Sequence, residues 1–438
     1  MAKKYIVTSY IPNADLCYDF IYALQKCAEV EKAELLVGQC KDNYKSDLVS
    51  PFELAIQEEL GKHLVTKFMR LNDKLCIHDF KESVNVIDPL SGIESDVADM
   101  GCLIVPFPRH RFKTVPRMLR ESRAPRAAWC TGSISHPYYK NTKSGSRMSR
   151  YHVYGALMVE IEDDHFDIRQ LTWDGEGFYD LDKYYTSKGM TKNHNIAALS
   201  MGDDHAVFQD PYVMEETYKL IDKLKPAYLF RHDTFDACSV THHLDGKHIT
   251  KSLVNMSLAE EARITARSIY HVQANYPKVN QVLVASNHPE HLDRYLDEGR
   301  YKDDHVNHIL ALELAWKKAE GHNVVEYLLN KYQPINKAQF LARKQSFKVL
   351  GIEMGDHGDE GANGSRGSTK EKGIVYSGKS VTGHTHSSEI GIYGNYVNGT
   401  STFLSLNYTK DSGSSSWLNT HTMVYKNGKM SHYHIIPR

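Results

Sequence analysis

Five short groups of polar side chains in the second half of the chain are of the types that bind divalent metal ions. Each group mixes carboxylate, amide or imidazole donors, which suit ions such as Mn²⁺, Mg²⁺, Fe²⁺ or Zn²⁺. None contains a cysteine, so a closed structural zinc site, which is rich in thiolates, is not expected. In chain order the groups are Asp203-Asp204-His205, His232-Asp233-Thr234-Phe235-Asp236, Ser286-Asn287-His288, Asp356-His357-Gly358 and Gly383-His384-Thr385-His386.

A short apolar run precedes each of the first four groups. The runs cover 196–201, 227–230, 281–285 and 348–353, and each ends where its group begins. This pattern is typical of a strand followed by a loop, and the carboxyl ends of parallel strands meet at one edge of a sheet. We therefore expect the groups to converge on one site. The segment from about 290 to 347 has helical apolar spacing and is predicted to be a helical insertion over that site.

The first part of the chain has an α/β pattern of its own. Strand-like alternation at 5–10, helical spacing at 14–31 and a strand-like run at 33–40 predict a parallel sheet, with further strands at 101–107 and 127–134. Residues 152–161 and 165–171 predict a hairpin. Periodicity is lost around 183–195, which divides the chain into an N-terminal α/β accessory domain, 1–194, and a site-bearing domain, 195–438.

A faint internal repeat relates the two regions. The segment Cys130-Thr131-Gly132-Ser133-Ile134-Ser135 is similar to residues 381–386 but lacks the histidines. The similarity is either chance or the trace of a degenerate duplicate of the same fold.

Composition narrows the class of protein. The 438 residues are 41% hydrophobic and 24% charged with a net charge of -1, as expected of a soluble globular protein. No apolar run approaches the length of a membrane span, and no signal peptide is recognised at the start. Seven cysteines without CxxC spacing favour reduced thiols. We expect a cytoplasmic protein, in the host cytoplasm if it is encoded by a phage.

The five groups, in this order, resemble the motifs of the calcineurin-like metallophosphoesterase superfamily. The resemblance covers roughly 195–438 and implies a two-sheet sandwich flanked by helices. It implies two divalent ions, with Mn²⁺ expected, bridged by Asp233 and holding a hydroxide that attacks phosphorus. It also implies that His288 is the catalytic histidine. The remaining implied ligands are Asp203, His205 and His386 for one ion and Asn287, His357 and His384 for the other.

Three positions depart from the pattern of the superfamily. His232 and Ser286 stand where glycines are usual, and Pro289 stands where an acidic residue follows the catalytic histidine. That acidic residue orients the imidazole and raises its basicity. The carboxylates left to replace it are Asp236, Glu290 and Asp204.

The details of the motifs favour one branch of the superfamily. The stretch His232 to Ala237 is similar to the Gly-Asp-x-Phe-Asp form of the DNA-repair exonuclease branch. Ala206 and Ala237-Cys238-Ser239 depart from the residues of the protein Ser/Thr phosphatases. Short segments at 151–156 and 166–171 look like parts of phage-encoded DNA-transfer nucleases. DNA is therefore the expected substrate.

Basic residues add a second indication of nucleic acid. Arginine clusters bind backbone phosphates, although a basic run can also simply face solvent or acidic neighbours. The arginines predicted to contact nucleic acid are Arg109, Arg111, Arg117, Arg120, Arg123, Arg126 and Arg366.

The sequence thus predicts a metal-dependent phosphodiesterase that hydrolyses DNA by means of a hydroxide activated by two metal ions. Two alternatives stay open. One is a phosphatase or phosphodiesterase acting on nucleotides or other small phosphoesters, and the other is a DNA-binding or assembly protein with a degenerate metal site. A homo-oligomer and a protein partner that gates access to the site are also left open.

Overall fold

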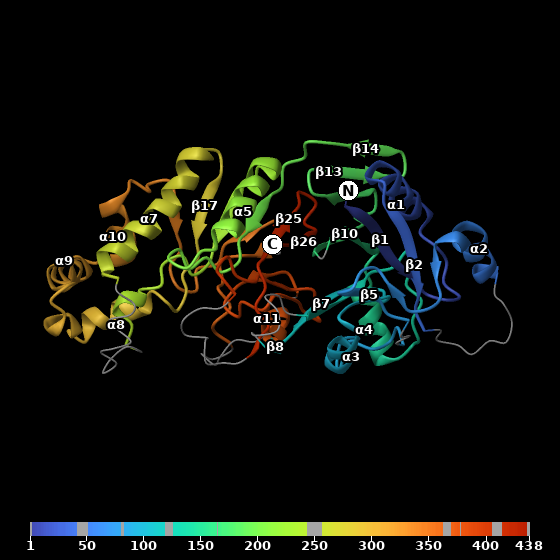
Figure 1. The fold of residues 1–438 in the computed structure, drawn as a ribbon, viewed down its shortest axis with the longest axis horizontal. Coiled ribbons are helices and arrows are strands. Elements are labelled where there is room, and N and C mark those ends of the chain that lie inside the picture. The colour runs from blue at the N-terminus through green and yellow to red at the C-terminus, as the bar shows by residue number, and fades with distance from the viewer. Residues whose placement is uncertain are drawn as a thin grey trace.

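The protein is a mixed α/β molecule built on several mixed sheets, which confirms the predicted α/β class. The computed structural model describes residues 2–41, 51–79, 83–118, 126–163, 165–242, 256–361, 369–376, 378–404 and 414–435. Figure 1 shows the chain spread along one long axis, with the helices of residues 290–332 at one end and the N-terminal region at the other.

The N-terminal sheet has five strands in the order β11-β10-β1-β2-β3. β1 is parallel to β2 and antiparallel to β10, and β10 and β11 form the hairpin predicted from the sequence. The bounds are β1 Lys3–Tyr10, β2 Glu34–Gln39, β3 Leu64–Val65, β10 Gly155–Glu162 and β11 His165–Thr172.

A second sheet of six strands carries the first three polar groups. Its order is β18-β17-β16-β15-β25-β26, with β15 to β18 parallel and β25 antiparallel to β15. The bounds are β15 Ala198–Ser200, β16 Tyr228–Arg231, β17 Asn280–Leu283, β18 Gln339–Phe340, β25 Thr420–Val424 and β26 Met430–His434.

The two sheets share a topology. In each, the first strand is parallel to the next along the chain and antiparallel to one strand of a later hairpin. A helix links the first two strands in both cases. Gly132 follows β9 (Arg126–Thr131) much as Gly383 follows β21 (Val381–Thr382). The interpretation of the N-terminal region as a degenerate duplicate stays a prediction.

An eight-stranded sheet joins the two regions. Its order is β21-β23-β22-β7-β9-β6-β5-β4, so strands from both sides of residue 194 hydrogen-bond within one sheet. The proposed division into domains at 194 stays a prediction. The remaining bounds are β4 Met69–Arg70, β5 Leu75–Ile77, β6 Cys102–Val105, β7 His110–Val115, β22 Glu389–Ile390 and β23 Tyr396–Val397.

Three small sheets complete the strands that the structure describes. They are β12 Gly177–Asp180 with β13 Lys183–Thr186 and β14 Gly189–Thr191, β19 Lys348–Val349 with β20 Ile352–Glu353, and β8 Arg117–Met118 with β24 Ser414–Ser415.

The segment predicted to be a helical insertion contains α8, η4, α9 and α10, and its role as an insertion over the site stays a prediction. The bounds are α1 Tyr18–Glu31, α2 Pro51–Leu60, η1 Gly61–His63, α3 Glu94–Met100, α4 Lys143–Tyr151, α5 Pro211–Leu224, η2 Cys238–Val240, α7 Leu258–Asn275, α8 Glu290–Asp297, η4 Arg300–Asp303, α9 His308–Ala319, α10 Val324–Tyr332 and α11 Thr369–Val375.

Two of these helices flank the six-stranded sheet and have strong start signals. The Asp210 side chain accepts a hydrogen bond from the Tyr212 amide at the start of α5, and proline occupies the first helical position. Ser257 and Glu260 form a reciprocal capping box at the start of α7. These caps fix the loops that enter the sheet edge near the polar groups.

The largest apolar core lies between the sheets. It combines side chains from all three large sheets, among them Val7, Phe112, Phe230 and Val424, each without exposed surface. Burial of such side chains contributes roughly 1.5–3 kcal/mol each. This shared core holds the sheet edges in fixed positions relative to one another.

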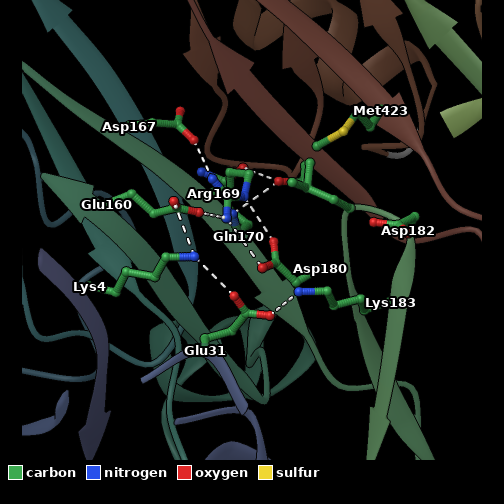
Figure 2. A network of polar contacts seen from close by, with 12 residues as sticks. Lys4, Glu31, Glu160, Asp167, Arg169, Gln170, Asp180, Asp182, Lys183 and Met423 are labelled. Atoms are coloured by element: carbon green, nitrogen blue, oxygen red, sulfur yellow. Dashed lines mark hydrogen bonds and ion pairs between the residues drawn. The ribbon is translucent and has the colours of Figure 1, made fainter. Parts of the chain in front are cut away.

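A buried ion-pair network ties the N-terminal elements together (Figure 2). Arg169 of β11, 3% exposed, contacts Asp167, Glu160 and Asp180, with its Nε 2.8 Å from Asp180 Oδ1. Next to it, Gln170 Oε1 accepts a hydrogen bond of 2.7 Å from the amide of His432 in β26. The network therefore fastens the five-stranded sheet to the six-stranded one.

Candidate metal centre

The polar groups follow parallel strands that are in register. Ser200 of β15 pairs with Phe230 of β16, which pairs with Val282 of β17, so the loops after these strands leave the same sheet edge. Asp203 pairs in an isolated bridge with Thr400, beyond β23, and its carboxylate accepts a hydrogen bond from the amide of His384 in the last polar group. The predicted convergence of the groups is therefore observed.

Asp233 is the central carboxylate of the site. It is 1% exposed, and its Oδ2 atom lies 3.1 Å from His357 Nε2, 3.7 Å from His205 Nε2 and 4.0 Å from His288 Nε2. Neither carboxylate oxygen forms a hydrogen bond within the described chain. Three imidazole nitrogens thus surround one carboxylate oxygen, and hydrogen bonding does not account for their approach.

Asp203 is the second buried carboxylate and connects the first group to the last. Its Oδ2 accepts a hydrogen bond of 2.7 Å from the His384 amide and lies 3.3 Å from His386 Nε2. A side-chain carbon at Gly383 would lie 2.0 Å from Asp203 Oδ1. The glycine is therefore required by the close approach of the carboxylate to this turn.

The geometry of the cluster fits a divalent metal ion. Ligand atoms of Asp203, His205, Asp233 and His386 all lie within 4.8 Å of one another. His205 Nε2 and His386 Nε2 are only 2.9 Å apart. Buried polar atoms left without hydrogen bonds are costly, and several gather here, including Asp203 Oδ1, both Asp233 oxygens and His386 Nδ1. Carboxylate and imidazole donors at these positions could hold an ion of the type that the sequence implies.

The backbone at this site is unusual. Four of the implied ligands have positive φ angles, which residues other than glycine seldom adopt. The angles are 40° at His205, 47° at Asp233, 77° at His384 and 56° at His386. Such conformations cost of order 1–3 kcal/mol each and cluster at functional sites.

Asp236 resolves the question raised by Pro289. Its Oδ1 atom lies 3.0 Å from His288 Nδ1 and 2.5 Å from His205 Nδ1. One carboxylate therefore contacts two imidazoles, and of the three carboxylates named from the sequence, Asp236 is the one that lies beside His288. His288 is 26% exposed, so its ring lies at the border between the buried cluster and solvent.

Fewer contacts connect the residues that are implied as ligands of the second ion. His357 contacts Asp233, and its ring centre is 5.3 Å from that of His384. Asn287 follows β17, and its side-chain oxygen is buried without a hydrogen bond. His232, seen from the sequence only as a departure from the pattern, groups with Asp203 and His357. The sequence signal that could have identified His232 as a site residue was its position directly before Asp233.

Burial and the neighbouring charged groups shift the pKa values of the residues in the cluster. Burial is the main reason that the pKa of Asp203 rises to about 7. Burial opposes the charged form of His205, but Asp236 and Asp233 hold its pKa at about 10. Burial likewise opposes the charged form of His357, but Asp233, together with Asp203 and Asp359, raises its pKa to about 9. The carboxylates thus draw positive charge into the site.

Asp204 has a structural role. Both it and Arg231 lack exposed surface, and Arg231 Nη2 lies 2.6 Å from Asp204 Oδ2. Arg231 also donates to Ser268 Oγ at 2.7 Å. This pair fixes the loop between Asp203 and His205 rather than facing the cluster.

The arginines predicted to contact DNA are dispersed. Arg109 and Arg111 are buried, and Arg111 pairs with Asp88 and Glu389. Arg126 donates to the carbonyls of Val97 and Ala98, while Arg117 is half-buried in β8. The guanidinium group of Arg111, which is buried and paired with two carboxylates, is not available to backbone phosphates. Arg120, Arg123 and Arg366 lie outside the described residues.

A pocket of about 380 Å³ opens beside His357. Basic side chains of Arg343, Lys344, Lys348 and Lys372 line it together with acidic ones. Arg343 forms a two-pronged contact with Asp359, at 3.1 and 2.8 Å. The Lys344 side chain is 74% exposed. His357 is the member of the buried cluster that lines this pocket.

Fold and site together define a mixed α/β protein with a buried cluster of histidines and aspartates that could hold metal ions. Protein A1 of Escherichia phage T5 is 31% identical over 98% of this chain and 81% of its own length, and the chain belongs to the family of that protein. No model of a known protein family matches the chain.

One solved structure has a low similarity to the chain. It is that of Chaetomium thermophilum Vps29 complexed with the RaPID-derived cyclic peptide RT-D3, which is 13% identical and matches 39% of this chain and 88% of its own with a TM-score of 0.26. A similarity of this size supports no argument about the site. Among the helices described, none is both long and apolar enough to cross a membrane.

Proposed function

We propose that the protein is a metal-dependent phosphodiesterase that hydrolyses DNA. The observation that carries the proposal is the buried group of Asp203, His205, Asp233 and His386, whose ligand atoms lie within 4.8 Å of one another. Divalent ions bound there would polarise a phosphoryl group and supply a nucleophile at neutral pH.

The chain's own residues have distinct tasks in this proposal. Asp233 contacts His205 from one implied set of ligands and His357 from the other, so its carboxylate would help to hold both ions. His288 contacts the cluster but keeps part of its ring in solvent, and Asp236 fixes its orientation. His288 is therefore positioned to donate a proton to the oxygen that leaves phosphorus.

DNA as the substrate is supported by the similarity of the His232 to Ala237 stretch to the DNA-repair exonuclease branch. The pocket beside His357 adds exposed lysines, Lys344 and Lys348, at the edge of the cluster. Lysines in this position would neutralise phosphates that flank a cleaved bond.

A second candidate is hydrolysis of nucleotides or other small phosphoesters. The observation in its favour is the volume of the same pocket, about 380 Å³, which falls in the range of small-molecule sites. Both candidates use the same cluster and differ only in what occupies the pocket.

The test compares linear, circular and single-stranded DNA with a panel of small phosphoesters, each with Mn²⁺, with Mg²⁺ and with EDTA. We expect metal-dependent cleavage of DNA that Asp233→Asn abolishes and His288→Ala lowers by about 100-fold or more. Asp222→Asn, an exposed change of the same type on α5, is the matched control and should retain full activity.

Each outcome assigns the site differently. Full cleavage by purified Asp233→Asn protein would show that the cluster is not the active site. Cleavage of small phosphoesters alone would establish the second candidate. Purified protein with no bound metal and no activity would instead favour the third hypothesis, a binding or assembly protein with a degenerate site.

A further inference from the structure

A separate pocket of about 220 Å³ lies where the N-terminal and C-terminal regions meet. Its lining comes from the start of β7, the end of α4, β22, β23 and the turn between β25 and β26. Arg109, His110, Arg150, His152 and Lys429 are among the lining residues, and no aspartate or glutamate is. None of them belongs to the candidate metal centre.

Arg109 is the buried cation of this pocket. It is 2% exposed, donates to the carbonyl of Ile87 at 2.7 Å and to that of Ile392, and lies over the Tyr151 ring at 5.2 Å. Its Nε has no hydrogen-bond partner. Burial, followed by the nearby Arg111, lowers its pKa to about 10, so it stays charged at neutral pH.

The lack of an acidic partner sets Arg109 apart. Four arginines are classed as buried in the described chain, and three of them form ion pairs: Arg111 with Asp88 and Glu389, Arg169 with Asp180, and Arg231 with Asp204. Arg109 forms no such pair with a described residue. A buried charge without a counter-ion is strongly unfavourable, so an anion at this place would remove a real energetic penalty.

Two further cations line the same small space. Arg150 is exposed at the end of α4, and Lys429 is half-buried in the turn before β26. Neither pairs with a carboxylate in the parts of the chain that the structure describes. Three positive side chains therefore converge without an acid among the lining residues.

His152 adds a neutral donor. Its Nδ1 atom lies 2.7 Å from the Tyr139 hydroxyl, and its buried Nε2 has no partner. When Tyr139 donates to Nδ1, the proton of the neutral ring is on Nε2. In that tautomer the Nε2–H is a donor on a residue that lines the pocket.

We propose that this pocket binds a phosphate group. Guanidinium groups match the geometry of phosphate oxygens, and the lysine and imidazole add donors around the same anion. The pocket volume of about 220 Å³ suits a phosphate group that carries only a small substituent. The phosphate belongs either to a nucleic-acid chain or to a free phosphate or nucleotide, and the chemistry of recognition is the same.

The first experiment measures binding of inorganic phosphate to the full-length protein by calorimetry. EDTA is present, so that phosphate bound through metal ions does not contribute. The double variant Arg150→Gln/Lys429→Gln removes two pocket cations and spares Arg109, which also links Ile87 to Ile392. The matched control, Arg147→Gln/Lys426→Gln, removes two exposed cations from the same helix and the same turn region outside the pocket.

We expect one phosphate site in the wild-type and control proteins, and an affinity lower by about tenfold or more in the double variant. Absence of phosphate binding by the wild-type protein would overturn the proposal. So would an equal loss in the control variant, because binding would then reflect net charge rather than this pocket. Unchanged binding by the double variant would overturn it as well.

A second arm distinguishes the sources of the phosphate. Short single-stranded DNA without terminal phosphates and a mononucleotide are titrated under the same conditions. A selective loss of DNA binding in the double variant assigns the pocket to the nucleic-acid chain. A selective loss of mononucleotide binding, with DNA binding unchanged, assigns it to a small phosphorylated ligand. Both results are independent of catalysis at the metal centre.

Discussion

Asp236 illustrates what a single residue contributes to the site. In the metallophosphoesterase motifs that the sequence resembles, an acidic residue follows the histidine that corresponds to His288, and this chain has Pro289 there. The structure supplies the carboxylate from the loop after β16 instead, where it contacts both His205 and His288. The carboxylate beside His288 therefore comes from a residue that is distant in the sequence but close in space.

The first prediction tests this replacement. Asp236→Asn removes the charge that holds two imidazoles in position, so we expect metal affinity or activity to fall by about 10- to 100-fold, the usual effect of losing an outer partner of a metal-binding histidine. Activity is measured across a titration of Mn²⁺, which separates weaker metal binding from slower turnover. Asp222→Asn is the control. Unchanged titration curves would show that Asp236 does not orient the two histidines.

At the scale of elements, the strand ends explain how a dispersed set of residues becomes one site. The sequence placed the strands before Asp203, Asp233 and Asn287 within a few residues of β15, β16 and β17. It did so because each apolar run is short and ends at polar residues. It could not place the eight-stranded sheet, since pairing between strands far apart in the chain has no local signal.

The burial of two arginines also could not be predicted from the local sequence. Arg109 and Arg111 belong to a basic run that is typical of a phosphate-binding surface. Their burial follows from the position of β7 between β22 and β9, a long-range pairing. The positive φ angles at the ligand positions could not be predicted from the sequence either. They arise from tight turns that are closed by contacts such as that between His384 and Asp203.

Gly383 provides a test of such a turn. In Gly383→Ala the new carbon would meet Asp203 Oδ1, so the carboxylate or the turn must move. We expect a loss of metal-dependent activity and a destabilisation of about 1–3 kcal/mol, the usual range for overpacking. Gly189→Ala is the matched control, because a carbon there has no atom within 4 Å.

The readout for this pair combines calorimetric metal binding with the free energy of unfolding in denaturant. A variant that folds normally but binds metal weakly would place the effect on the carboxylate. Full metal affinity and full activity in Gly383→Ala would contradict the close approach of the turn to Asp203.

At the scale of the whole molecule, two sheets of the same topology are fastened by a third sheet and by the contacts of Gln170 with β26. In the faint sequence repeat, Ser133 and Ser135 of the N-terminal region correspond to His384 and His386. Ser9 donates to the carbonyl of Gly132, and Ser135 accepts from the Ile11 amide. Neutral groups thus hydrogen-bond to one another near the end of β1, whereas the groups of described residues that could hold a metal ion lie in the C-terminal region.

The joined sheets bury several neutral histidines, which makes the stability of the protein depend on pH. Burial lowers the pKa of His110, His152, His421 and His432 to about 4 each. An unfolded histidine takes up a proton near pH 6.5, well before the folded ones do. The unfolded state therefore binds more protons between pH 6.5 and 4, and folding stability falls as the pH is lowered through that window.

The last prediction isolates one of these residues. His421 accepts a hydrogen bond from the Gly202 amide and lies 2.7 Å from Thr217 Oγ1, away from solvent. Each such histidine adds up to about 1.4 kcal/mol per pH unit to the slope of unfolding free energy against pH. We expect His421→Gln to reduce this slope between pH 6.5 and 4, measured by urea unfolding in EDTA, whereas His322→Gln, at an exposed position, leaves it unchanged. The comparison uses slopes, so a uniform loss of stability does not obscure it, and equal slopes in wild type and His421→Gln would mean that His421 titrates normally in the folded protein.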